Sequence, residues 1–129
     1  MPLTSQEVFQ RYIHAGALSR DPAAVAALFT EDGVYEAPLA RDGDVFPRRL
    51  TGHDEIRAGI AQAYAKMPPV TDPVDPTRTS FTLHSTADPD VVIAEIDTTS
   101  VSGATMSLVQ IFRVRDGRIS HLRDYFAGF

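Results

Sequence analysis

The 129-residue sequence predicts an α+β fold, because helical patterns fill its first half and strand patterns fill its second. Three stretches before residue 67 repeat apolar residues at helical spacing, and four stretches after residue 76 are rich in β-branched and aromatic residues. The proline-rich segment 68–76 separates the halves and cannot form a helix or a central strand. We therefore expect one domain, residues 1–129, with three N-terminal helices packed on a mostly antiparallel sheet.

Capping signals mark the starts of the first two helices. Thr4 and Glu7 form a T-x-x-E capping box ahead of an apolar stripe, which predicts a helix from about 4 to 18. Asp21-Pro22 suits the cap and the first position of a second helix, which is expected to end near Thr30.

The third helix begins with acids in its first turn, where the helix dipole favours them, at Asp54 and Glu55. The pair Pro68-Pro69 is expected to end it. Between the second and third helices, 34–37 is typical of a short strand and 39–50 of a polar loop.

Four strands with short turns are expected in the second half, which predicts an antiparallel meander. Their ranges are 77–85, 91–101, 104–115 and 118–126, separated by turn signals at 88–90, 102–103 and 116–117. Both alternate sets of residues in 108–114 are largely apolar, so this strand is expected to be buried on both faces. One face can meet the helices, and the other is expected to form a homodimer through the sheet, although long loops would also cover it.

Composition excludes several classes of function. The net charge is −5, from 12 basic and 17 acidic residues, and the basic residues form no long cluster, so nucleic-acid binding is not expected. Cysteine is absent, which excludes disulfides and thiolate sites, and the four histidines are too scattered to predict a metal site. The sequence has neither a signal-peptide pattern nor a membrane-spanning apolar run, so we expect a cytoplasmic protein without membrane contact.

Three motifs carry a resemblance to a known group of proteins: ALSRDPAAVAALFTEDGVYEAP, LTGHDEIRAGI and DGRISHLRDYF. With these motifs the chain resembles the nuclear transport factor 2-like superfamily, and within it the SnoaL-like polyketide cyclases, ketosteroid isomerases and limonene epoxide hydrolases. The resemblance covers nearly the whole chain. It implies a cone-shaped α+β barrel, with the three helices packed on a curved, mixed, mostly antiparallel sheet. This barrel would surround a pocket for a small molecule, with no cofactor.

The likeness to ketosteroid isomerases implies roles for three residues. Tyr12 matches their hydrogen-bonding tyrosine within Gln10-Arg11-Tyr12, and Gln110 takes the place of their protonated aspartic acid. Ala37 stands where their catalytic base lies, and an alanine cannot accept a proton. An unchanged steroid-isomerase mechanism is therefore not expected.

The likeness to limonene epoxide hydrolases implies a second set of roles. Asp97 and Asp124 take the positions of their two aspartates, and Tyr35 matches a tyrosine that helps to hold the attacking water. Their bridging arginine falls at Glu95 and a water-binding asparagine at Ala37, so the water site departs from the family pattern.

Strand alternation leaves two interpretations of the acidic residues. Glu95 and Asp97 share one face of their strand, and an acidic face is usually solvated, whereas the resemblance puts this face inside the cone. Asp124 lies between Leu122 and Phe126 on one face, which fits either a site residue or a structural hydrogen-bond acceptor.

From these arguments we expect a cofactor-free acid–base enzyme, of cyclase, isomerase or epoxide-hydrolase type, acting on a small, largely apolar or polyketide-like molecule. Three carboxyl groups crowded in an apolar pocket would have raised pKa values, leaving one acid beside one base. The expected catalytic residues are Asp97, Asp124, Glu95, Tyr35 and Tyr12, and the expected substrate-binding residues are Gln110, Phe112, Ala37, Phe126 and Tyr64. The alternatives are a non-catalytic small-molecule binding protein and a protein–protein module of the same fold.

Overall fold

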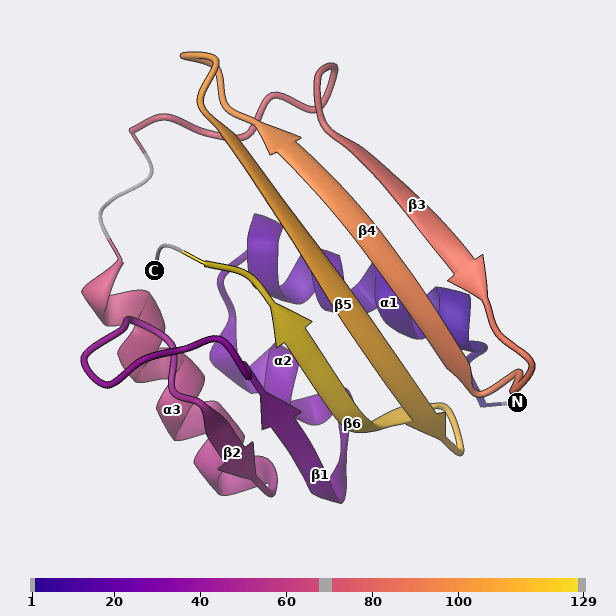
Figure 1. Cartoon of the computed structure of the whole chain (residues 1–129). Coiled ribbons are helices and arrows are strands. Elements are labelled where there is room, and N and C mark those ends of the chain that lie inside the picture. Colours follow the sequence, from indigo (N-terminus) through magenta and orange to yellow (C-terminus); the bar gives the residue numbers. More distant parts are fainter. Residues whose placement is uncertain (1, 68–70, 128–129) are drawn as a thin grey trace.

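The computed structural model describes residues 2–67 and 71–127, and it places the helices of this part on one face of a six-stranded sheet (Figure 1). The helices are α1 (Ser5–Ile13), α2 (Pro22–Ala27) and α3 (His53–Lys66), and the strands are β1 (Phe29–Glu36), β2 (Arg49–Thr51), β3 (Ser80–Ser85), β4 (Val91–Thr99), β5 (Thr105–Arg115) and β6 (Arg118–Tyr125). The strand order is β2-β1-β6-β5-β4-β3. Strands β1 and β6 pair in parallel and the other named pairs are antiparallel. The α+β class and the mixed sheet are confirmed, but the sheet is open rather than closed into a barrel.

The first helix begins as its capping box predicts. The Thr4 side chain accepts from the backbone N–H of Glu7, and the Glu7 side chain accepts from the backbone N–H of Thr4. The expected range is split, because α1 passes into a π-helical turn, η1 (His14–Leu18). A Cβ atom on Gly16, in this turn, would lie 3.3 Å from the hydroxyl of Tyr64. A glycine there lets the tyrosine hydroxyl approach closely.

The second helix is shorter than its pattern predicts. It ends at Ala27, and Phe29 and Thr30 already belong to β1, which pairs in parallel with β6 from Phe29↔Ile119 onwards. Tertiary pairing therefore overrides the helical spacing of these apolar residues. The loop expected over 39–50 also contains the start of a short edge strand, β2, which pairs with β1.

The predicted meander is confirmed, with strands a few residues shorter than expected. At the hairpin between β5 and β6, Asp116 and Gly117 have φ values of 53° and 77°, as a type I′ turn requires. The β4–β5 ladder runs without a shift from Val91↔Arg113 to Thr99↔Thr105. This unbroken register decides which β4 residues face the helices.

The core lies between the helices and the inner face of the sheet, by which we mean the helix-facing side. The rings of Phe9 and Tyr12 both meet Phe112 edge-on, with centroids 5.6 and 5.4 Å apart. Pro68 and Pro69, which were predicted to end the third helix, lie outside the described residues. Within the described part of the chain, no helix is both long and apolar enough to cross a membrane.

Candidate functional site

The sheet register places three residues in one row across the inner face. Asp124 on β6 pairs with Gln110 on β5, and Gln110 pairs with Ala94 on β4. Ala94 is fully buried, and the exposed fractions of Gln110 and Asp124 are only 4% and 7%. Paired residues on neighbouring strands point to the same face, so the polar pair Gln110 and Asp124 lies inside the protein.

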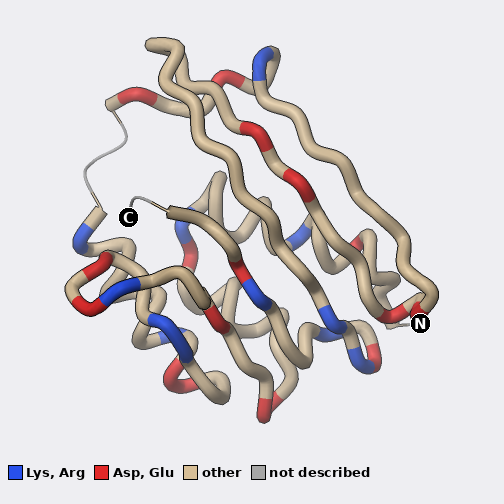
Figure 2. Tube along the Cα trace, in the orientation of Figure 1, with Lys and Arg blue, Asp and Glu red and all other residues tan. Residues whose placement is uncertain are grey.

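Glu95 and Asp97 lie on the outer face instead, so the prediction that they meet Asp124 is wrong. Both side chains are exposed: Nε2 of His84 lies 2.6 Å from a Glu95 carboxylate oxygen, and the Ser107 hydroxyl donates to Asp97 at 2.6 Å. The physical reason is the two-residue period of a strand without a bulge, which gives the inner positions of β4 to Ala94 and Ile96. In Figure 2, red acidic positions lie along the strand that Figure 1 labels β4.

Three tyrosines from different elements surround Asp124. Tyr12 comes from α1, Tyr35 from β1 and Tyr64 from α3, and each interacts electrostatically with the Asp124 carboxylate. The Tyr35 hydroxyl donates a long hydrogen bond of 3.4 Å to Oδ2 of Asp124. The structure thus brings Tyr12, Tyr35 and Tyr64 together around Asp124, and the roles assigned to them from sequence stay predictions.

The tyrosines stay protonated near neutral pH. Burial raises the pKa of Tyr12 and Tyr35 well above the usual value, and the nearby Asp124 charge raises both further. Burial likewise raises the pKa of Tyr64 to about 12, against the opposing effect of Arg20. All three phenols can therefore act as neutral hydrogen-bond donors.

Asp124 has the properties of a proton carrier near neutral pH. Burial raises the pKa of its carboxyl group from 3.8 to about 7, while hydrogen bonding by Gln110 and Tyr35 acts in the opposite direction. Removal of water disfavours the charged form, and the two polar neighbours only partly replace that water. A carboxyl group with this pKa can both accept and return a proton at physiological pH.

Two buried oxygens of this cluster have no hydrogen-bond partner among the described residues: Oδ1 of Asp124 and Oε1 of Gln110. Buried acceptors are normally satisfied, and an exception calls for a functional explanation.

Aromatic rings lie at the end of the cluster. Phe46, in the loop between β1 and β2, packs edge-on against Tyr64 and Phe126, with centroids 6.4 and 5.6 Å apart. Phe126 and Tyr64 were predicted from sequence as substrate-binding residues. Phe46 was missed, because a lone aromatic residue in a polar loop carries no periodic signal that would place it.

The two remaining predicted binding residues are buried. Ala37 directly follows β1 and is 1% exposed, and its backbone N–H donates to the carbonyl of Arg48. Phe112 has no exposed surface and packs against the rings of Phe9 and Tyr12. Phe112 therefore positions Tyr12 by packing.

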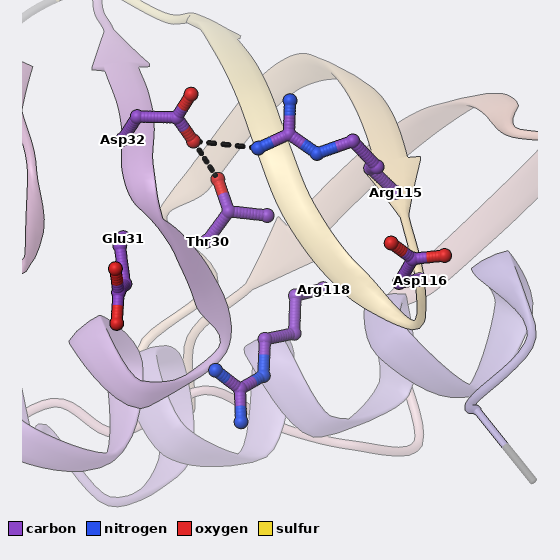
Figure 3. A pocket seen from close by; sticks show the side chains of 6 residues that line it. All are labelled: Thr30, Glu31, Asp32, Arg115, Asp116 and Arg118. Carbon is purple, nitrogen blue, oxygen red and sulfur yellow. Dashed lines mark hydrogen bonds and ion pairs between the residues drawn. The ribbon is translucent and has the colours of Figure 1, made fainter.

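A surface pocket of about 720 Å³ lies away from this cluster, near the start of β6, whereas Asp124 is near the end of that strand (Figure 3). Its lining residues are Thr30, Glu31, Asp32, Arg115, Asp116 and Arg118. Arg115 and Asp32 neutralise each other at 2.6 Å. None of the predicted site residues lines this pocket. Within the described part of the chain, no cluster of three or more His, Cys, Asp or Glu side chains could hold a metal ion.

Comparison with solved structures gives the same fold for most of the chain. A Bacillus subtilis protein provisionally described as an isomerase is 26% identical, with a TM-score of 0.69, and the match covers 95% of this chain and 86% of that one. A phenazine biosynthesis-related protein of Pseudomonas aeruginosa is 18% identical, with a TM-score of 0.69 and coverage of 95% and 75%. A Catenulispora acidiphila protein with a ketosteroid isomerase-like fold, solved with trimethylamine, is 18% identical, with a TM-score of 0.67 and coverage of 94% and 85%.

No curated protein matches the chain. The SnoaL-like domain family, by contrast, matches residues 9–122, which include α2, α3, all of β1 to β5 and most of β6. The inner-face position of Asp124 and the order of the elements agree with the resemblance seen in the sequence. The chain belongs to the SnoaL-like domain family.

Proposed function

We propose that the protein is a cofactor-free acid–base enzyme of isomerase type, which uses Asp124 as its proton carrier. The observation that carries this proposal is the burial of Asp124 among three tyrosines, with a pKa raised to about 7. The buried surroundings suit a small, largely apolar substrate with a carbonyl group. The 26% identity to the Bacillus subtilis protein described provisionally as an isomerase supports the same reaction type.

The reaction needs one carboxyl group. In a substrate with a C=C bond between the β and γ carbons, the Asp124 carboxylate takes a proton from the α carbon next to the carbonyl. The C–H electron pair becomes a C=C bond of the resulting dienolate. The Tyr12 or Tyr35 hydroxyl donates to the enolate oxygen and stabilises its charge. Asp124 then returns the proton to a different carbon, so the double bond moves and no atom is gained or lost.

Isomerisation is favoured over epoxide hydrolysis by the number of buried carboxyl groups. Opening an epoxide in the manner that the resemblance implies needs two aspartates around one water, and Asp97 points to the outer face. A cyclisation that proceeds through an enolate uses the same single base and remains compatible with the proposal.

The experiment follows proton exchange, which needs no knowledge of the natural substrate. Purified protein is incubated in D2O with a panel of small cyclic ketones, and deuterium incorporation next to the carbonyl is measured by mass spectrometry. Asp124→Asn is expected to slow exchange by about 100-fold or more. The matched outer-face variant Asp97→Asn is expected to retain the wild-type rate. Equal exchange by wild type and Asp124→Asn would refute the proposal.

The second candidate is a binding protein of the same fold without catalysis. It is favoured by Ala37, which is buried at the position where the resemblance expects a base. Tight binding of a ligand that is recovered unchanged, together with no deuterium exchange in any ketone, would select this candidate.

We also propose that two copies pair through the outer face of the sheet. Ile93 and Ile111 are cross-strand neighbours on that face and are only half-buried in one copy. The cytoplasmic location stays a prediction.

A further inference from the structure

Two unsatisfied acceptors belong to neighbouring residues in the interior. Oδ1 of Asp124 and Oε1 of Gln110 belong to paired residues of β6 and β5, and both side chains are more than nine-tenths buried. A ligand that satisfies both oxygens must present two hydrogen-bond donors from one small group.

Among the described residues, the negative charge of Asp124 also has no counter-charge. No described basic side chain forms an ion pair with it, and the groups that face it from α1, β1, α3 and β5 are Tyr12, Tyr35, Tyr64 and Gln110. These four side chains are uncharged at neutral pH.

Two basic residues close to this site act on other groups. Arg123, the neighbour of Asp124 on β6, turns to the outer face, where Nε lies 3.9 Å from a Glu36 carboxylate oxygen. Arg20 and Asp21 act on Tyr64, and neither appears among the influences on Asp124. A buried carboxylate without a cationic partner favours a ligand that brings one.

The surroundings of the carboxyl group are aromatic. The rings of Tyr64, Phe46 and Phe126 form a continuous edge-on series, which starts at Tyr64, the member that interacts with Asp124. Aromatic rings attract cations through their negatively charged faces and also pack against apolar substituents.

We propose that Asp124 and Gln110 bind the ammonium group of a small primary or secondary amine that carries an apolar substituent. Two N–H groups donate to Oδ1 of Asp124 and Oε1 of Gln110, and the substituent packs against the aromatic rings. An alcohol offers one donor and no charge, and a quaternary ammonium offers charge and no donor. This inference rests on the Asp124 site of the proposed function and names the class of ligand that it takes.

The test compares three probes that share one ring: benzylamine, benzyl alcohol and benzyltrimethylammonium. Binding is measured by calorimetry at pH 7 in two buffers of different ionisation enthalpy. Benzylamine is expected to bind about tenfold or more tightly than either of the others. Its binding is expected to release about half a proton, because the ammonium group displaces the proton from the fraction of Asp124 that carries one at pH 7.

Variants identify the two acceptors. Asp124→Asn is expected to lose about tenfold or more in benzylamine affinity together with the proton release. Gln110→Leu is expected to weaken binding while keeping the proton release, and Asp97→Asn, whose side chain lies on the outer face, is expected to match wild type. Circular dichroism confirms that each variant is folded before its affinity is compared.

The proposal is overturned if benzylamine does not bind, if the alcohol binds as tightly, or if folded Asp124→Asn binds benzylamine normally. Its failure is distinct from that of the proposed function. If Asp124→Asn loses deuterium exchange but the wild type does not bind benzylamine, the amine-binding proposal fails and the proposed enzyme activity stands. If the wild type binds benzylamine but catalyses no deuterium exchange, the proposed enzyme activity fails and the amine-binding site stands.

Discussion

Two carboxyl groups on opposite faces of one sheet have pKa values shifted in opposite directions. Glu36 lies on the outer face beside His121, Arg49 and Arg123. Burial raises the pKa of Glu36, but its hydrogen bond with His121 and the charges of Arg49 and Arg123 outweigh burial and hold the pKa below the usual value. Asp124 lies on the inner face with only neutral neighbours, and burial raises its pKa to about 7. The face decides whether a carboxyl group is a permanent charge or a proton carrier.

The largest expected effect comes from the residue that packs behind the inner site. Phe112→Ala removes a fully buried ring that contacts Tyr12, and it is expected to lower the free energy of unfolding by about 3–5 kcal/mol. The control is the next residue on the same strand, since Arg113→Ala changes an exposed outer side chain and is expected to cost less than about 0.5 kcal/mol. Urea denaturation measures both, and equal losses would contradict the assignment of faces.

The next effect is a pH-dependent gain in stability on replacing Asp124. The folded protein holds the Asp124 proton up to about pH 7, whereas the unfolded chain releases it near pH 3.8, so this group lowers stability as pH rises between those values. The change in the free energy of unfolding caused by Asp124→Asn is expected to be more favourable above pH 7 than at pH 4, by up to about 4 kcal/mol. Denaturation curves from pH 4 to 9 measure the difference, and a constant difference would contradict the raised pKa.

The outer face is expected to control assembly. Ile111→Glu places a charge among half-buried apolar residues and is expected to convert the proposed dimer into monomers, whereas Ala61→Glu, at an exposed position of α3, is expected to leave it intact. Light scattering measures the molar mass. A monomeric wild type, or a dimeric Ile111→Glu variant, would reject the interface.

The smallest effects are expected for the acids on β4. Asp97→Asn and Glu95→Gln remove exposed charges whose hydrogen-bond partners, Ser107 and His84, are also exposed. Each is expected to change the free energy of unfolding by less than about 0.5 kcal/mol. A loss of several kcal/mol in thermal or urea denaturation would indicate that these carboxyl groups are buried.

Much of the fold and half of the site could be predicted from sequence, for identifiable reasons. The capping box at Thr4 and the turn at Asp116-Gly117 are local signals, and both are found where expected. The alternation of Leu122, Asp124 and Phe126 correctly placed Asp124 on the inner face, because Leu122 must be buried.

The misplaced residues needed information from other parts of the chain. In Val91–Thr99 the alternation alone favoured a solvated face for Glu95 and Asp97, and the family resemblance wrongly reversed that interpretation. Phe29 joined a strand because of its parallel pairing with Ile119, which lies 90 residues further along the chain. Phe46 lies near the site because of the conformation of its loop, and a loop conformation produces no periodic pattern in the sequence.

The most direct measurement of the central claim is the titration of Asp124 itself. Carbon-13 NMR of the aspartate carboxyl groups, assigned by comparison with Asp124→Asn, gives the protonation of this side chain at each pH. A midpoint near pH 7 is the predicted result. A midpoint near 4 would mean that the carboxyl group is hydrated or paired, and it would contradict its assignment as the proton carrier.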